Sequence, residues 1–263
     1  MKYVHSANHR ATLGKYLRKQ YKTLLNNLNS HSVRPLYSEV LPCFVVGCGH
    51  SGTTLTAAKL GNHSKAYLIG RETHHFAPAK GLYSSYLVAS EWIALFETLG
   101  KKVFIEKTPK HVHAVDRILR VLPNARIIVM VRNPLDNCFS LFRRYGDLDY
   151  AIDRWNMDNR KALQVIQSSQ AKLVSYESMT TAPQEEFGSI CHFLGMEWDP
   201  SIIESGDTAY DDVRHERNMT VRQEQVRRPI TPSTGAWKEG LTEAQVERVL
   251  DQTNPIAGRL GYT

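Results

Sequence analysis

Residues 43–56 of the chain read CFVVGCGHSGTTLT. A short apolar run at 43–46 ends abruptly in the glycine-rich segment 47–54, and an amphipathic run begins at Leu55. This pattern predicts a buried strand, a glycine-rich loop and the start of a helix. Glycines let backbone N–H groups approach a ligand closely, and a helix N-terminus adds unpaired donors and the positive end of its dipole. The stretch therefore predicts a site for a phosphate-like anion.

Short apolar runs alternate with helical patterns along the rest of the chain. Strands are predicted at residues 43–46, 65–69, 103–105, 127–131 and 172–176. Helices are predicted at residues 12–28, 55–60, 83–99, 111–122, 134–144, 148–167, 185–194 and 241–250. This alternation favours one α/β domain in which helices flank a central parallel sheet, as in P-loop NTPases. We expect residues 1–40 to form a helical extension and residues 41–263 to form the domain.

The composition indicates which kinds of binding partner and which cellular compartment to expect. The 263 residues carry a net charge of +7, which favours anionic partners, but the basic residues are scattered, which argues against nucleic acid. The four cysteines form no CxxC pair, so a reducing compartment is expected. No signal-peptide pattern and no apolar run of about 18–20 residues is present. These features predict a cytoplasmic protein without stable membrane insertion.

A second group of polar residues follows the strand predicted at 127–131. Arg132 leaves that strand at its end, and Ser140 lies eight residues later in the next predicted helix. Asn133 is expected to cap this helix, with Pro134 at its first position. A guanidinium group and a hydroxyl group so placed can bind an anion, although a structural salt bridge at Arg132 is the alternative.

These segments resemble those of sulfotransferases that use 3′-phosphoadenosine 5′-phosphosulfate (PAPS), closer to the glycan and bacterial branch than to the cytosolic branch. The spacing from Gly47 to Gly52 matches the start of a Walker A loop, but Thr53 stands where that loop has lysine. The sequence HSGTT at 50–54 resembles the family's 5′-phosphosulfate loop, and Arg132 with Ser140 resembles its 3′-phosphate motif. The segments RETHHF at 71–76 and FIEKTP at 104–109 resemble those holding the family's general base and its sulfuryl-binding lysine. The resemblance covers residues 43–238, and it is loose at 227–238.

The resemblance implies transfer of a sulfuryl group from PAPS to a hydroxyl or amine, with release of adenosine 3′,5′-bisphosphate (PAP). It implies a catalytic set of Glu72 as general base, Lys107 and His50. It implies a nucleotide-binding set of Gly49, His50, Ser51, Gly52, Thr53, Thr54, Arg132, Ser140, Arg227, Arg228, Trp237 and Lys238. Acceptor binding is expected from Arg71, His74 and His75. No metal is expected, because no HExxH or Cys/His pattern is present.

Two other functions stay open at this point. A P-loop kinase or NTPase is disfavoured because the loop lysine is missing and no strand-end aspartate for Mg²⁺ is evident, Glu106 being a weak substitute. A non-catalytic nucleotide-binding module on the same fold is the other alternative. The acceptor is expected to be a small molecule or a glycan, and whether the protein is a homodimer is left open.

Overall fold

The computed structural model describes residues 33–204 and 230–262. The predicted helix at 12–28, most of the predicted 1–40 extension, and Arg227 and Arg228 lie outside these residues.

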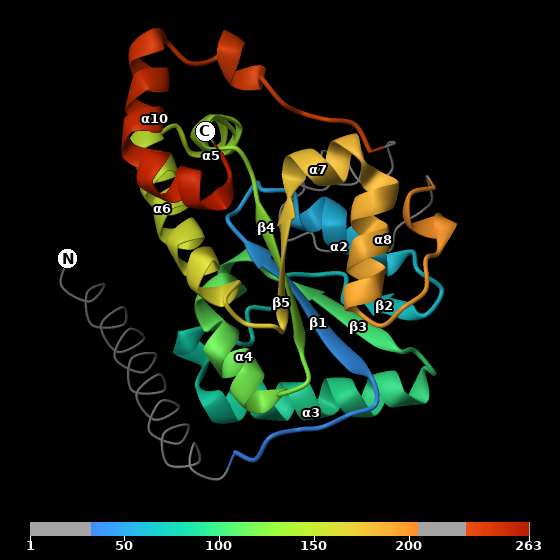
Figure 1. The fold of residues 1–263 in the computed structure, drawn as a ribbon. Coiled ribbons are helices and arrows are strands. Elements are labelled where there is room, and N and C mark those ends of the chain that lie inside the picture. The colour runs from blue at the N-terminus through green and yellow to red at the C-terminus, as the bar shows by residue number, and fades with distance from the viewer. Residues whose placement is uncertain (1–32, 205–229, 263) are drawn as a thin grey trace, which may run out of the picture.

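The core of the fold is a five-stranded sheet in which every neighbouring pair of strands is parallel (Figure 1). Its strands are β1 (Leu41–Gly47), β2 (Ala66–Leu68), β3 (Val103–Lys107), β4 (Arg126–Val131) and β5 (Ala171–Ser175). Their spatial order is β2-β3-β1-β4-β5. The chain moves from β1 towards one edge of the sheet and from β4 towards the other, which makes the space between β1 and β4 the switch point where such sheets bind ligands. The predicted parallel α/β architecture is confirmed.

Helices cover both faces of this sheet (Figure 1). The α-helices are α2 (Thr53–Gly61), α3 (Leu82–Thr98), α4 (Val115–Val121), α5 (Pro134–Tyr145), α6 (Leu148–Val165), α7 (Tyr176–Thr181), α8 (Pro183–Phe193) and α10 (Glu243–Ala257). Short 3-10 helices are η2 (Pro78–Lys80), η3 (Pro109–Ala114), η4 (Pro200–Ile202), η5 (Ala236–Glu239) and η6 (Gly258–Leu260).

The strands are apolar on both faces because both faces are covered. Along β1, Phe44 and Val46 pack with residues of α3, α4 and α6, whereas Cys43 and Val45 pack with residues of α2, α7 and α8. Successive side chains of a strand point to opposite faces, so the unbroken apolar run builds two cores at once. A third apolar cluster joins α5, α6 and α10 and includes Cys48 of the glycine-rich loop.

The structure departs from the predicted elements at several of their ends. β3 continues to Lys107, two residues beyond the predicted end at 105. The last predicted strand stops at Ser175, whose side chain caps α7 by accepting a hydrogen bond from the Ser178 N–H group. The predicted helix at 111–122 begins as the 3-10 helix η3, with Pro109 in its first turn. The final helix continues to residue 257, beyond the predicted 250, because its inner face stays buried.

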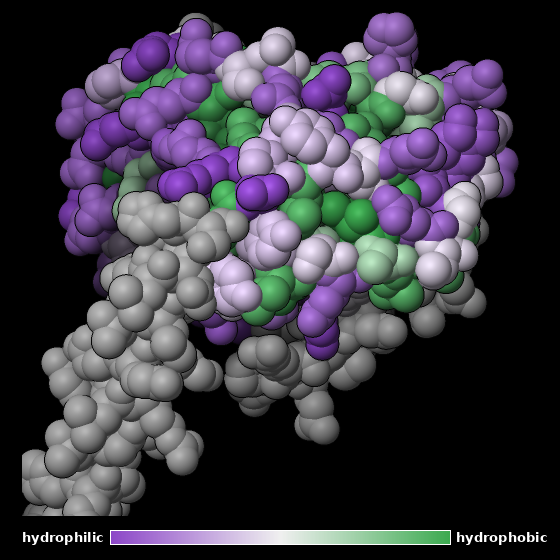
Figure 2. Space-filling model, turned by 90° about the horizontal axis from the view of Figure 1, so that it is seen from below, coloured by the Kyte–Doolittle hydropathy of each residue, from purple (hydrophilic) through white to green (hydrophobic). Residues whose placement is uncertain are grey.

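The face seen in Figure 2 carries hydrophobic side chains interspersed with polar ones. Exposed leucines of α3 are Leu87 and Leu95. Within residues 33–204 and 230–262, no helix combines the length and the apolar character needed to span a membrane.

Candidate active site

Polar segments follow four of the strands at one edge of the sheet. Because all five strands are parallel, their carboxyl ends meet at this edge. Residues 48–52 follow β1, residues 69–76 follow β2, Thr108 follows β3 and Arg132 follows β4. The fold therefore gathers the segments that the sequence singled out.

The loop after β1 has a conformation that requires glycine at two positions. Gly47 has φ +140°, and a Cβ atom there would lie 2.2 Å from the Met130 carbonyl oxygen of β4. Gly52 has φ +93°, and a Cβ atom there would lie 2.7 Å from the Tyr176 ring. Side chains rarely adopt such φ values, and these contacts exclude them. The two glycines bring the loop against β4 and α7.

Gly52 is the N-cap residue of α2, and no side chain caps this helix start. The first N–H groups of a helix have no partner within it, so an uncapped start suits an anion. The Ser51 hydroxyl, by contrast, is buried and donates to the Cys48 carbonyl oxygen at 2.7 Å. This hydroxyl holds the loop in shape.

His50 lies at the turn of the loop, is partly buried and has φ +67°. Of the described non-glycine residues, only His50 and His74 have positive φ. Such conformations cost energy and gather at functional sites. The His50 Nδ1 atom is 2.8 Å from the Ser140 hydroxyl oxygen of α5. The two predicted anion ligands therefore lie side by side, although they are 90 residues apart in the sequence.

Arg132 is buried at the end of β4, between the loop and the C-terminal segment. Its guanidinium group donates to the carbonyl oxygens of His50, at 3.0 Å, and of Ser233. It also lies over the Tyr176 ring, 4.2 Å from the ring centroid. The two carbonyl groups and the ring carry no negative charge. They therefore do not neutralise the positive charge of the guanidinium group. The buried Nε atom has no hydrogen-bond partner in the described part of the chain. An anionic ligand would fit such a group.

Asp136 connects the start of α5 with the segment that follows residue 230. Its Oδ1 atom accepts a hydrogen bond from the Gly235 N–H group at 2.8 Å. Burial raises the pKa of Asp136, although the Arg132 charge and the N–H groups of Gly235 and Ala236 oppose this. Asn133, not Asp136, caps the helix by accepting from the Leu135 N–H group. Residues 233–235 are thus bonded to the Arg132 side of the site.

Glu72 and Lys107 form an ion pair at the other side of the site. The Lys107 Nζ atom donates to the Glu72 Oε1 atom at 2.6 Å, and the lysine side chain is fully buried whereas the glutamate is 21% exposed. The His74 Nε2 atom lies 3.6 Å from the second Glu72 oxygen. A carboxylate at the surface is thereby held against a buried ammonium group, and one side of the pair faces solvent.

The remaining predicted acceptor residues, Arg71 and His75, lie in the same segment after β2 as Glu72. Arg71 is exposed, while His75 is half-buried with its ring near Trp92. Burial, followed by the charges of Lys80 and Arg71, lowers the pKa of His75 below its usual value. His75 is therefore neutral at pH 7, and this rim carries cationic side chains beside a neutral imidazole.

Residues 85–200 match the model of the sulfotransferase family. This segment of the chain is therefore similar to the sulfotransferase family. The matched segment contains Lys107, Arg132 and Ser140 and excludes the glycine-rich loop and Glu72. A curated relative, an uncharacterized protein of Aquifex aeolicus, is 24% identical over 273 residues, which cover 84% of this chain and 36% of the relative. The chain thus spans about a third of the length of that relative.

Solved sulfotransferase structures share the fold. The sulfotransferase domain of the Synechococcus PCC 7002 olefin synthase superposes with a TM-score of 0.64 at 21% identity, covering 88% of this chain and 98% of that one. A mouse sulfotransferase in complex with PAP gives a TM-score of 0.50 at 12% identity, covering 85% of this chain and 86% of that one. The single-domain, P-loop-like sulfotransferase fold follows from these likenesses.

Two residues beside the predicted site, Tyr176 and Glu177, were not predicted from the sequence. Tyr176 and Glu177 follow β5 at the same edge of the sheet as the predicted ligands. Glu177 accepts hydrogen bonds from the Asn133 N–H group at 2.9 Å and from the Tyr262 hydroxyl at 2.8 Å. Their position at the end of a strand could have indicated them. They were missed because the predicted strand continued to Tyr176.

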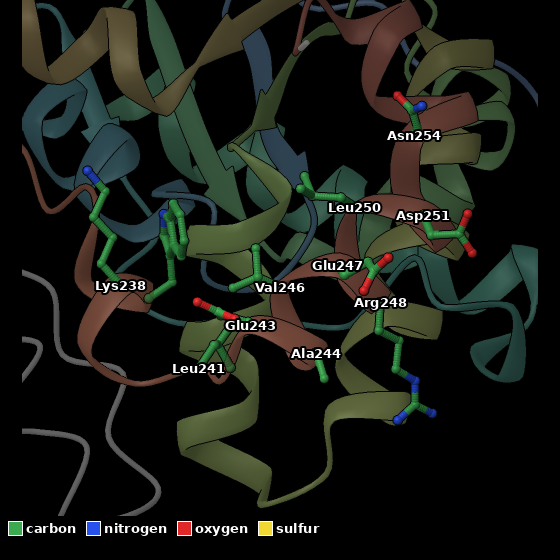
Figure 3. Close-up of a pocket in the computed structure, with 11 residues that line it drawn as sticks. Lys238, Leu241, Glu243, Ala244, Val246, Glu247, Arg248, Leu250, Asp251 and Asn254 are labelled. Atoms are coloured by element: carbon green, nitrogen blue, oxygen red, sulfur yellow. The ribbon is translucent and has the colours of Figure 1, made fainter.

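A separate open groove of about 1080 Å³ lies between η5 and α10. It shares only Trp237 and Lys238 with the predicted sulfotransferase site. Figure 3 shows three carboxylates extending from α10, those of Glu243, Glu247 and Asp251. Lys238 and Arg248 also line the groove, so three carboxylates and two cations lie there. The candidate active site lies instead at the sheet edge, where most of the other predicted ligands are gathered.

The two neighbouring histidines His111 and His113 each form a hydrogen bond with a carboxylate. His111 bonds Glu106 at 3.0 Å, and His113 bonds Asp158 at 2.6 Å, so the two side chains belong to different networks. In the described ranges, no group of three or more His, Cys, Asp or Glu side chains is arranged to hold a metal ion. That the reaction needs no metal stays a prediction.

Ser140→Ala is expected to weaken PAP binding about tenfold without loss of folding. The hydroxyl lies beside His50, and losing a hydrogen bond to a charged group costs about 1.5–3 kcal/mol. Arg132→Ala is expected to weaken binding at least as much. Isothermal titration with PAP measures both, with Ser90→Ala on α3 as the matched serine control. Unchanged PAP affinity in Ser140→Ala would remove this residue from the nucleotide site.

Proposed function

We propose that the protein transfers the sulfuryl group of PAPS to a hydroxyl or amine of a small-molecule or glycan acceptor and releases PAP. The observation that carries this proposal is the Glu72–Lys107 pair, 2.6 Å apart, at the same sheet edge as the glycine-rich loop and Arg132. A candidate base and a cation are thereby combined with a set of candidate anion ligands.

The donor is assigned to the loop and the start of α5. The loop N–H groups and His50 would bind the 5′-phosphosulfate, and Arg132 with Ser140 would bind the 3′-phosphate. The uncapped start of α2 and the unpartnered Arg132 Nε atom support this assignment. Trp237 and Lys238, in η5, would contact the adenosine end.

The transfer step is assigned to Glu72 and Lys107. Glu72 would accept the proton of the attacking hydroxyl while the acceptor oxygen forms its bond to sulfur and the bond from sulfur to the phosphate oxygen breaks. Lys107 would stabilise the negative charge that develops on the leaving phosphate oxygen. An ammonium group has three N–H donors, so contact with Glu72 does not exclude contact with the sulfuryl group.

The acceptor is assigned to the rim formed by Arg71, His74 and His75. These residues follow β2 in the same segment as Glu72, and His74 lies beside its carboxylate. Incubation of the protein with ³⁵S-labelled PAPS and a panel of phenols, alcohols, amines and glycans tests the proposal. Transfer of label to at least one acceptor is expected, and no transfer to any of them, despite PAPS binding, would favour a non-catalytic module.

The nucleotide preference separates this proposal from a kinase. PAP is expected to raise the melting temperature by several degrees, and ADP with Mg²⁺ is expected to raise it little, because a ligand that binds only the folded protein stabilises it. Differential scanning fluorimetry at matched nucleotide concentrations measures both shifts. Equal shifts would contradict a site built for a 3′-phosphate and would favour the kinase alternative.

A further inference from the structure

Glu106 is a fully buried carboxylate directly before Lys107 on β3. Successive residues of a strand point to opposite faces, so Glu106 does not share the orientation of Lys107. No role was predicted for it beyond that of a weak substitute for a Mg²⁺ ligand. A buried carboxylate is costly unless hydrogen-bond donors surround it, which raises the question of what its donors are.

The donors come largely from the segment that carries Glu72. The Thr73 hydroxyl and N–H groups approach the Glu106 Oε1 atom at 2.9 and 3.3 Å. The Thr108 hydroxyl donates to the same oxygen at 2.5 Å and also accepts from the Thr73 N–H group at 3.1 Å. Glu106 and Thr108 together therefore fix the residue immediately after Glu72.

The second Glu106 oxygen is bonded to His111, which holds the other end of the same segment. The His111 Nε2 atom accepts from the Phe76 N–H group at 3.3 Å. Its Nδ1 atom must then carry the proton that is donated to the Glu106 Oε2 atom at 3.0 Å. Residues 73 and 76 are thus both bonded to one network centred on Glu106.

Glu106 itself is poorly placed to act as the base. Both of its oxygens are occupied by donors, and the residue is closed to solvent. Burial alone would raise its pKa, yet the hydrogen bonds from His111, Thr108 and Thr73 hold the pKa below its usual value. The carboxylate is therefore charged and structurally engaged at neutral pH.

We propose that Glu106 is a positioning residue that fixes the segment 73–76 and so holds Glu72 against Lys107. This inference rests on the proposed sulfuryl transfer, in which Glu72 is the base. The geometry gives a reason for it: Glu72 lies next to the anchored Thr73, while its partner Lys107 lies next to Glu106. One buried carboxylate thus fixes the backbone on both sides of the ion pair.

Glu106→Gln keeps the shape and replaces one of the two acceptor oxygens with an NH₂ group. Whichever way the amide faces, either the donors of Thr73 and Thr108 or the Nδ1–H group of His111 lose their acceptor. We expect turnover to fall at least ~10-fold, because small misplacements of a reacting group carry large rate penalties. PAP affinity should stay within about twofold of wild type, because none of the Glu106 contacts described above is to a predicted nucleotide ligand. Thr73→Val should repeat the loss of turnover, and Thr73→Ser, which keeps the hydroxyl, should restore it.

Hydrogen–deuterium exchange gives a readout that does not depend on catalysis. In Glu106→Gln, exchange of the amides at 73–76 should rise at least ~10-fold while the β1–β4 ladder stays protected, since local opening is separable from global unfolding. Wild-type turnover in Glu106→Gln, or unchanged exchange at 73–76, would overturn the positioning role. Absence of sulfuryl transfer in the wild-type protein would count against the proposed function instead, and the exchange experiment would still decide whether Glu106 holds this segment.

Discussion

Glu72→Gln is expected to bind PAP as tightly as the wild-type protein and to transfer the sulfuryl group at least ~100-fold more slowly. Glutamine keeps the shape of the side chain and removes its basicity, and a general base contributes about 10²–10⁴-fold to a rate. Single-turnover transfer at saturating PAPS and acceptor measures the chemical step directly.

The alternative for Glu72 is that it only pairs with Lys107 and stabilises the loop. In that case Glu72→Gln would lower the melting temperature while the bound complex still reacted. A transfer rate within about threefold of wild type would be too small a loss for a base. Glu97→Gln is the matched control, because Glu97 is exposed at the end of α3 and bonds Ser38, which precedes β1 at the opposite edge of the sheet.

Lys107→Met is expected to slow transfer by about 10²–10³-fold, the range seen when a donor that stabilises developing charge is removed. Methionine fills a similar volume without the charge, and Glu72 keeps access to water. PAP keeps the phosphate oxygen that Lys107 would contact, so both PAP and PAPS should bind more weakly to this variant. Rapid-quench measurement of transfer, together with titrations of both nucleotides, tests these expectations.

Lys59→Met provides the control for Lys107→Met. Lys59 is equally buried, lies on α2, and donates to the Glu204 carbonyl oxygen rather than to the Glu72 side of the site. We expect this variant to transfer at close to the wild-type rate. If the transfer rates of Lys107→Met and Lys59→Met fall by the same small factor, the loss comes from replacing a buried lysine in general. In that case Lys107 has no specific role in the reaction.

The strands and the edge of the sheet that carries the site could be predicted because both depend on local pattern. Apolar runs such as 127–131 predicted the strands. A parallel sheet then brings the residues that follow each strand to one edge. The caps were predictable for the same reason, as Asn133 and Pro134 show. The missed helix α7 is only six residues long, too short for an amphipathic period to stand out.

The contacts across the site were beyond sequence reasoning because they join distant segments. Nothing in the sequence indicates that His50 bonds Ser140, or that Glu106 receives hydrogen bonds from Thr73. The partners of Arg132 are equally hidden, because a carbonyl oxygen at Ser233 carries no side-chain signature. Such pairings depend on the register and order of the strands, which residue types alone do not determine.

The contacts around Arg132 and Asn133 also suggest at what stage of synthesis the protein could first bind a nucleotide. Ser233 bonds Arg132, Gly235 bonds Asp136, and Tyr262 bonds Glu177, which in turn accepts from Asn133. A ribosome delivers the chain from its N-terminus. The sheet strands, all before residue 176, can therefore emerge and pair while these partners are still untranslated. We therefore expect a nascent chain to form the described sheet before the partners of Arg132, Asp136 and Glu177 are present, and to gain PAP binding late in synthesis.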